Sequence, residues 1–207
     1  MDEKIFLLVR PELESTGIWK LQNSRKNSIR ENVSYESLNL PDDLIEAYIA
    51  WQELYNNCSF LDVDAFDWKS FNEQGLELAK RLKVCLFYEA IIEYSDTQGT
   101  QKIYGYMVMA DFCSSLWTDE DSSCILEDVE DDLSDFKIVD RELLQKQFET
   151  WITDFNDCLT NSLDWESFNA KGNQLVEELQ KHLPDYCVVF YNNAYEEFHP
   201  MWWEKKD

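Results

Sequence analysis

Residues 67–72 read Asp-Trp-Lys-Ser-Phe-Asn and are followed by Gly75. The same pattern returns as Asp-Trp-Glu-Ser-Phe-Asn at 164–169, followed by Gly172. A match of this length, at a spacing of 97 residues, indicates an internal repeat, and repeats decide the architecture of a chain before any other feature does.

The repeat extends in both directions from these stretches. Over the 28 positions from residue 67 to residue 94, 10 are identical to their partners 97 residues later. Upstream, Lys4 precedes Trp19 by fifteen residues, as Lys102 precedes Trp117. We therefore predict a tandem duplication of a unit of about a hundred residues, with a first copy at 1–98 and a second at 99–207.

Each copy has the pattern of a ββααβ unit, with room for one more strand in its polar segment. An apolar run opens the copy (5–9 or 103–109), a Trp-containing strand follows, and a β-branched and aromatic run closes it (90–94 or 187–191). Between them lie two helices. The first has an apolar stripe at spacings of 4, 3 and 4, formed by Leu44, Tyr48, Trp51 and Tyr55, and again by Leu144, Phe148, Trp151 and Phe155.

Helix boundaries follow from the same comparison. Pro41 suits the first turn of the first helix, and Asp140 suits the N-cap of its counterpart in the second copy. Asp67 and Asp164 suit the N-cap of the second helix in each copy. Glycine inside a helix costs about 1 kcal/mol relative to alanine, so Gly75 and Gly172 predict that another backbone packs closely there. Residues 95–101 read as a short flexible linker. The predicted class is α+β, with two similar lobes packed about a pseudo-twofold axis.

Charge is the extreme feature of the composition. The chain has 18 basic and 42 acidic residues, for a net charge of −24. The first copy carries 10 basic and 18 acidic residues, and the second carries 8 and 24. Such a field repels nucleic acid and anionic membranes and accelerates encounter with basic partners. It therefore predicts a basic protein as partner and argues against direct binding of nucleic acid.

The N-terminal residues, the length of the apolar runs and the cysteine spacing together predict the cellular compartment. The N-terminal residues have no basic region before a long apolar run, and no stretch approaches the roughly 18 apolar residues of a membrane span. The cysteines have no CxxC or zinc-like spacing, and disulfide bonds are the alternative to reduced thiols. The six are Cys58, Cys85, Cys113, Cys124, Cys158 and Cys187. We expect reduced thiols in a cytoplasmic protein.

The sequence contains no recognisable motif for catalysis or for cofactor binding. His182 lies at a predicted helix end and His199 lies near the C-terminus, and neither has a counterpart in the first copy. A dinucleotide or phosphate loop and the HExxH motif are missing. We predict no enzyme activity, no cofactor and no metal. The one enzyme alternative would use a carboxylate group formed by Asp62, Asp64 and Asp67.

An acidic segment, residues 119–135, is the predicted partner-binding site. Its nine acidic residues are Asp119, Glu120, Asp121, Glu127, Asp128, Glu130, Asp131, Asp132 and Asp135. The matching stretch of the first copy, 20–30, is basic, and this divergence favours use of the acidic one. Asp119, Asp121 and Ser123 have the spacing of EF-hand calcium ligands, but Cys124 stands where an EF-hand loop needs glycine. The pair Trp202 and Trp203 is the rival contact site, because exposed aromatic residues are frequent hot spots.

The pattern of the unit resembles a family of bacterial proteins. Its parts are a small-residue turn before Trp, an aromatic helix ending near Trp51, then Asp-Trp-x-x-Phe-Asn-x-x-Gly and an aliphatic strand. This is similar to immunity proteins of polymorphic toxins, including contact-dependent growth inhibition systems. The resemblance implies a cytosolic, non-enzymatic protein that covers the active site or substrate surface of a nuclease toxin. The alternatives left open are a nucleic-acid mimic that inhibits a host defence enzyme, and the carboxylate enzyme above.

Overall fold

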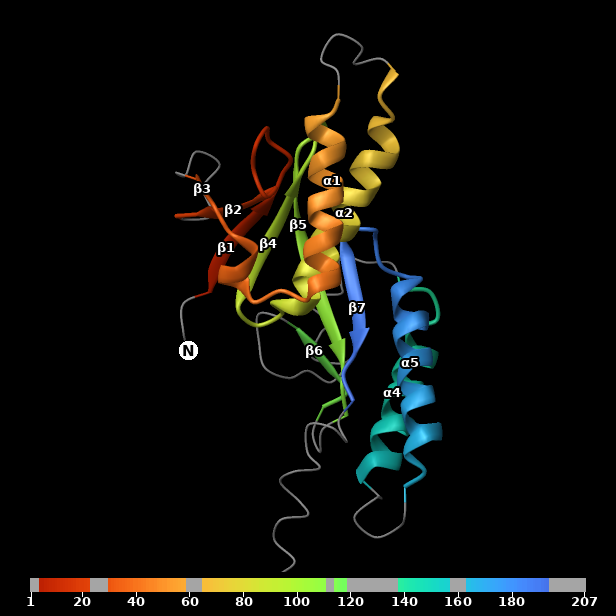
Figure 1. Ribbon diagram of the computed structural model, residues 1–207. Helices are drawn as coiled ribbons and strands as arrows, with labels where there is room; N and C mark the ends of the chain where they lie inside the picture. The colour runs from red at the N-terminus through yellow and green to blue at the C-terminus, as the bar shows by residue number, and fades with distance from the viewer. Residues whose placement is uncertain are drawn as a thin grey trace, which may run out of the picture. The chain divides into compact units, whose positions relative to one another are not determined.

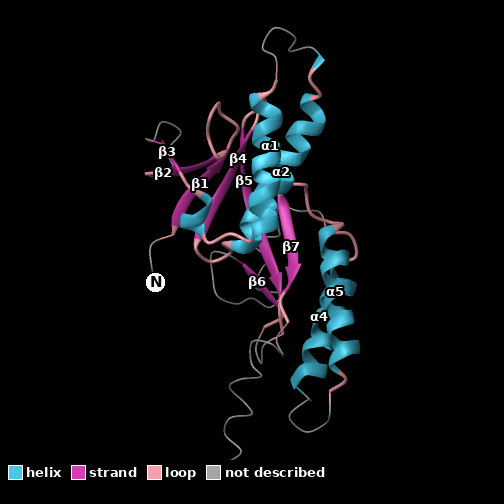
Figure 2. Ribbon diagram, viewed as in Figure 1, coloured by secondary structure: helices cyan, strands magenta, loops and turns pink. Residues whose placement is uncertain are grey.

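A computed structural model describes residues 4–22, 30–58, 65–110, 114–118, 138–156 and 163–193. The nine acidic residues of the predicted binding segment, and Trp202 and Trp203, lie outside these ranges. Within them the fold is α+β, with a mixed sheet and four α-helices, which confirms the predicted class (Figures 1 and 2). The chain divides into two compact units, residues 1–104 and 105–207.

The sheet of the first unit is built around β1, a run of five apolar residues. β1 pairs in parallel with β4 and antiparallel with β2, β2 pairs with β3, and β4 pairs with the start of β5, giving the order β3-β2-β1-β4-β5. The bounds are β1 Ile5–Val9, β2 Ile18–Leu21, β3 Arg30–Asn32, β4 Ala90–Ser95 and β5 Thr100–Val108. The predicted opening and closing strands are confirmed.

Two α-helices of the first unit follow from the predicted stripe and cap. α1 (Asp42–Asn56) begins directly after Pro41 and buries Leu44, Tyr48 and Trp51. α2 (Trp68–Cys85) begins after Asp67, whose carboxylate accepts a hydrogen bond from the Ser70 backbone N–H over 3.1 Å. A short 3-10 helix, η1 (Tyr35–Leu38), precedes α1 and was not predicted.

Trp51 is the centre of the first unit's core. It is 1% exposed and stacks on Phe71, with ring centroids 5.0 Å apart and planes 12° from parallel. Its indole Nε1 donates to the Phe71 carbonyl over 3.0 Å. Joining α1 to α2 through both packing and a hydrogen bond fixes the two helices in register, because a buried indole N–H needs an acceptor.

The second unit contains the end of β5, β6 (Leu116–Thr118), α4 (Arg141–Asn156), α5 (Trp165–Gln180) and β7 (Cys187–Tyr191). β5 pairs antiparallel with β6 and also pairs with β7. α4 starts directly after Asp140, whose backbone carbonyl accepts hydrogen bonds from Leu143 and Leu144. Asp164 caps α5 through Ser167, as predicted.

Contacts in the second core match those in the first. Trp151 is 2% exposed and stacks on Phe168, with centroids 4.7 Å apart and planes 11° from parallel. Its Nε1 donates to the Phe168 carbonyl over 3.1 Å. The predicted core role of both tryptophan stripes is thereby confirmed.

The two β-hairpins, in contrast, differ by one residue in register. Val9 faces Ile18 in β1–β2, whereas Val108 faces Leu116 in β5–β6, although the repeat would pair Met107 with Leu116. The loop is therefore one residue shorter in the second hairpin. In an antiparallel pair a one-residue shift changes the face on which each side chain lies.

The prediction that another backbone packs against the two helical glycines is wrong. Aromatic rings fill the space beside Gly75 and Gly172. A Cβ on Gly75 would lie 2.6 Å from Trp51 Cζ2, and one on Gly172 would lie 2.3 Å from Tyr191 Cε2. Glycine is therefore needed because a tyrosine or tryptophan ring lies against the helix axis, and the cost in helix propensity is offset by that packing.

The predicted linker is also corrected. Residues 95–101 include the end of β4, a tight turn and the start of β5. Asp96 N–H donates to the Gly99 carbonyl over 3.0 Å, and the Asp96 carboxylate accepts from the Gln98 and Gly99 amides. An aspartate side chain that holds the following amides defines a turn, so this stretch joins two paired strands.

Candidate functional site

The structure describes the residues on either side of the acidic segment, and the segment itself lies outside the described residues. Residues 119–137 join Thr118, the last residue of β6, to Ile138, just before α4. In the first unit the corresponding connection runs from β2 to α1 and includes β3 and η1. The two connections thus occupy the same place in the order of elements but differ in sign of charge.

A groove between α4 and α5 is the candidate binding site that the described residues form. Its volume is about 540 Å³. Trp151 and Leu175, which are both buried, form its apolar part. The complete lining is Leu143, Lys146, Gln147, Thr150, Trp151, Asp154, Lys171, Gln174, Leu175, Glu177 and Glu178.

Polar contacts hold the walls of this groove. Lys171 on α5 pairs with Asp154 on α4, with Nζ 2.8 Å from Oδ2. Lys181 pairs with Glu178 over 2.9 Å. All four side chains are at least partly exposed, so these pairs contribute little to stability and mainly orient the charges. The groove therefore presents mainly charged and polar side chains, and its exposed apolar residue is Leu143, because Trp151 and Leu175 are buried beneath it.

The helix pair of the first unit, α1 and α2, has an ion pair at the positions that correspond to two residues of the groove lining. There Asp43 on α1 and Arg81 on α2 form an ion pair, with Oδ2 and Nη2 2.7 Å apart. At the repeat offsets, Leu143 and Glu178 replace them in the second unit. Leu143 is 58% exposed, the second largest exposure among the large hydrophobic side chains described. Leu143 and Glu178 both line the groove, so the second unit presents an exposed leucine where the first unit has an ion pair.

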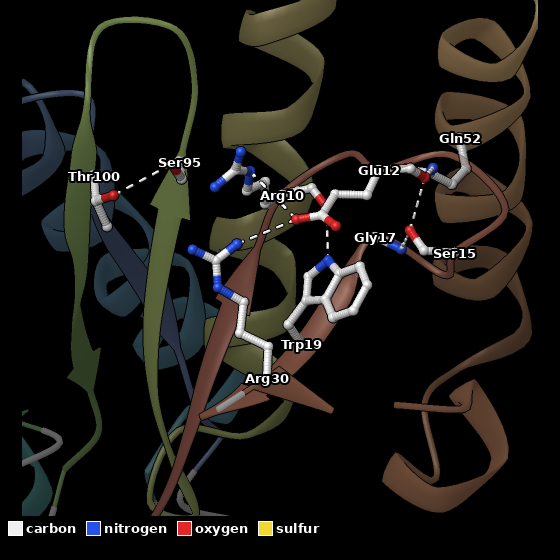
Figure 3. Close-up of polar contacts among 9 residues, drawn as sticks. All are labelled: Arg10, Glu12, Ser15, Gly17, Trp19, Arg30, Gln52, Ser95 and Thr100. Carbon is white, nitrogen blue, oxygen red and sulfur yellow. Dashed lines mark hydrogen bonds and ion pairs between the residues drawn. The ribbon is translucent and has the colours of Figure 1, made fainter. Parts of the chain in front are cut away.

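A second candidate is the polar cluster at the β1–β2 turn (Figure 3). The Glu12 carboxylate accepts a hydrogen bond from Arg30 Nη1 over 3.1 Å and lies 3.5 Å from Arg10 Nε. Gln52 of α1 donates to the Glu12 carbonyl, and Ser15 Oγ donates to the same oxygen over 2.9 Å. The Glu12 carboxylate thus offsets one of the two arginine charges, and the Gln52 bond anchors the turn to α1.

This cluster has an evident structural role. The turn brings Gly17, at φ 78°, against Gln52, and a Cβ on residue 17 would lie 3.0 Å from Gln52 Oε1. Among the described residues that buried oxygen has no hydrogen-bond partner. Trp19 Nε1 completes the turn by donating to the Arg10 carbonyl over 3.1 Å. Fixing the loop between β1 and β2 explains these contacts without a ligand.

The shifted pKa values point to packing and helix capping. Burial raises the pKa of Tyr191 and of Cys187 to about 12, and also raises that of Tyr94. A hydrogen bond from the Ser167 hydroxyl lowers the pKa of Asp164, which caps α5. Tyr191 and Tyr94 pack on the helical glycines, so their neutral forms belong to the core.

The carboxylate group of the enzyme alternative is only partly described. Asp62 and Asp64 lie outside the described residues, and Asp67 is occupied as the N-cap of α2. Within the described ranges no three His, Cys, Asp or Glu side chains form a metal-binding group. Cys58, Cys85 and Cys187 are free thiols.

Two polar residues have structural roles that the sequence analysis does not predict. Lys83 is 0% exposed, and its Nζ donates to the carbonyls of Phe87 and Ala90 over 3.2 and 2.9 Å. Gln180, at the equivalent position, bonds to Cys187 and Val189. One signal was available: Lys83 continues the buried positions of Gly75 and Ala79 at a spacing of four, where an apolar residue is expected.

Comparison with known proteins leaves the chain without an assigned family. No family model, no curated protein and no solved structure matches it. Among the helices described, none combines the length and the apolar character needed to cross a membrane.

Proposed function

We propose that this chain is a non-enzymatic inhibitor that binds a basic protein, namely the nuclease-type toxin domain for which it serves as the immunity protein in the bacterial cytoplasm. The observation that carries the proposal is the net charge of −24. An enzyme that handles RNA or DNA has a cationic cleft, which a strongly acidic protein complements. Complementary charge raises association rates to about 10⁸–10⁹ M⁻¹s⁻¹ at low salt.

The position of the charge supports a specific contact surface. Nine acidic residues lie in the segment 119–135, while the corresponding segment of the first copy, 20–30, is basic. Loops of opposite sign at equivalent places indicate that one of them has diverged for a task. We propose the acidic segment as the main contact surface, with the pair Trp202 and Trp203 as its rival and the α4–α5 groove as a further candidate.

Internal duplication is the second part of the proposal. It is supported by the repeated sequence and by matched contacts: both core tryptophans stack on a phenylalanine of the next helix and bond to its carbonyl. Both second helices have an aspartate cap and a glycine beneath a tyrosine ring. A pseudo-twofold packing of the two copies stays a prediction. Duplication leaves one copy free to keep the fold while the other changes its surface.

Coexpression tests the function directly. The open reading frame next to this gene is expressed with and without the chain, and toxicity and copurification are measured. The proposal expects that product to be toxic alone and to form a salt-sensitive complex with the chain. A harmless product that forms no complex would refute the immunity role. Capture of a nucleic-acid-binding defence enzyme from an infected host would instead support a nucleic-acid mimic.

A further inference from the structure

The closing strand of the second unit, β7, has a defined inner and outer edge. The Asn192 N–H donates to the Val108 carbonyl on β5 over 3.0 Å, so this residue points its backbone groups at β5. Backbone groups of successive residues in a strand point to opposite sides. The N–H and C=O groups of Cys187 and Val189 therefore lie on the outer edge. Among the described strands, β5 is the one neighbour of β7.

The side chain of Gln180 occupies that outer edge. Its Nε2 donates to the Cys187 carbonyl over 3.1 Å, and its Oε1 accepts from the Val189 N–H over 2.9 Å. In a parallel sheet one residue of the adjacent strand donates to residue i−1 and accepts from residue i+1 of its neighbour. The primary amide of Gln180 makes the same two bonds at residues 187 and 189, so it takes the place of a strand residue.

The first unit shows why the residue here is glutamine. At the equivalent position, Lys83 donates to the Ala90 carbonyl. Its closing strand, β4, already has a neighbour on that edge, because Ile92 pairs with Ile103 of β5. A donor-only ammonium therefore suffices in the first unit. In the second, Val189 N–H also needs an acceptor, and a glutamine amide can both donate and accept.

Without this amide, the backbone groups on the outer edge of β7 could pair with another strand. Its sequence, Cys-Val-Val-Phe-Tyr, contains no charge and no proline, the features with which proteins usually protect an edge. Two identical strands can pair antiparallel about a twofold axis, since each then offers the same groups to the other. For β7, pairing centred on Val189 would use the backbone groups that Gln180 occupies.

We infer that Gln180 closes the outer edge of β7 and so prevents a second copy of this chain from adding its own β7 strand there. The role is independent of any toxin partner. It also assigns a reason to the Lys83–Gln180 difference between two otherwise similar helix ends.

Oligomeric state tests the inference. Gln180→Leu keeps a side chain of similar size but removes both bonds, and Gln180→Lys keeps a donor but leaves Val189 N–H without its acceptor. Sedimentation equilibrium at moderate salt, which screens the repulsion between acidic chains, should show concentration-dependent dimers for both variants and not for the natural chain. Lys83→Leu is the matched control, because β5 still covers β4; it should be destabilised without any change in association.

A second substitution separates edge pairing from aggregation of a damaged fold. Val188→Lys places a charge on the strand, and charged residues at an edge oppose strand addition. Combined with Gln180→Leu, it should return the chain to the mass of the natural protein. Circular dichroism checks that each variant is folded. Folded Gln180→Leu that does not self-associate, or dimers that Val188→Lys leaves intact, would each overturn the inference.

Discussion

The Trp51 indole lies on the ring of Phe71 at a centroid distance of 5.0 Å and donates a hydrogen bond to the carbonyl of the same residue. One residue of α1 thus contacts both the side chain and the backbone of one residue of α2. Trp151 and Phe168 repeat this relationship with a centroid distance of 4.7 Å. Both indoles are nearly inaccessible to solvent, so each is a buried contact between the two helices of its unit.

Trp51→Ala and Trp151→Ala should therefore destabilise the protein by similar amounts. Removing a buried aromatic side chain costs about 3–5 kcal/mol, and here a helix–helix hydrogen bond is also lost. Denaturant unfolding followed by far-UV circular dichroism measures the loss. If one variant unfolds like the natural chain, the corresponding stripe does not hold its helices together. Trp68→Ala, at a partly exposed position, is a control expected to cost less.

Gly75→Ala and Gly172→Ala should destabilise the chain although alanine is the better helix former. The added methyl carbon would lie 2.6 Å from Trp51 Cζ2 in the first case and 2.3 Å from Tyr191 Cε2 in the second. Overpacking of this kind costs about 1–3 kcal/mol, against a gain of about 1 kcal/mol in helix propensity. Asn173→Ala, on the exposed side of α5, is the control and should be nearly neutral. Raised melting temperatures in the glycine variants would contradict the packing.

Alkaline pH should destabilise the fold through its buried tyrosines. Tyr191 has an ordinary pKa of 10.0, and burial raises it to about 12. Folding thus favours the protonated, neutral form. The resulting stabilisation is complete below pH 10 and is lost as the pH rises towards 12. Unfolding monitored together with tyrosinate absorbance should show this, and Tyr191→Phe should make the loss less steep. Full ionisation at pH 10 in the folded protein would disprove it.

Neutralising the acidic segment should weaken the toxin complex. Asp128→Asn, Asp131→Asn and Asp132→Asn together remove three negative charges, so we expect slower association and a flatter dependence on salt. Charge reversal in the basic segment 20–30, at Lys20 in β2 and at Arg25 and Lys26, is the comparison and should matter less. Surface plasmon resonance at several salt concentrations measures both. An unchanged association rate and affinity would exclude the segment from the interface.

Trp202→Ala tests the rival contact in the same assay. A buried aromatic anchor acts mainly on dissociation, whereas peripheral charges act mainly on association. Faster dissociation with an unchanged association rate would assign the binding energy to the C-terminal pair. Leu143→Ala examines the α4–α5 groove in the same way, since this exposed leucine contributes to its lining.

The regular parts of the fold could be predicted because their signals are local. The stripe through Leu44, Tyr48 and Trp51 has the period of a helix, and Asp67 and Asp164 carry cap chemistry in their side chains. β3, which reads Arg-Glu-Asn, has neither apolar alternation nor β-branched residues; its pairing depends on the free edge of β2. No local signal indicates such a strand.

The site was harder to predict for a different reason. Composition locates excess charge, but a groove depends on which side chains of two helices face each other. Leu143 reads as one more apolar residue of α4, and only its place in the groove lining, where the first unit has the Asp43–Arg81 ion pair, makes it distinctive. The role of Gln180 likewise depends on which edge of β7 lacks a neighbour.

β5 begins as the neighbour of β4 and ends as the neighbour of β6 and β7, with the boundary between the units, at residues 104 and 105, inside it. A genetic break at the turn near residue 98 would leave Ile92 and Tyr94 of β4 without their partners on β5. A break within β5 would shorten the strand for both halves. The two units can therefore differ in surface charge, but neither break would separate them into fragments without loss of strand pairing.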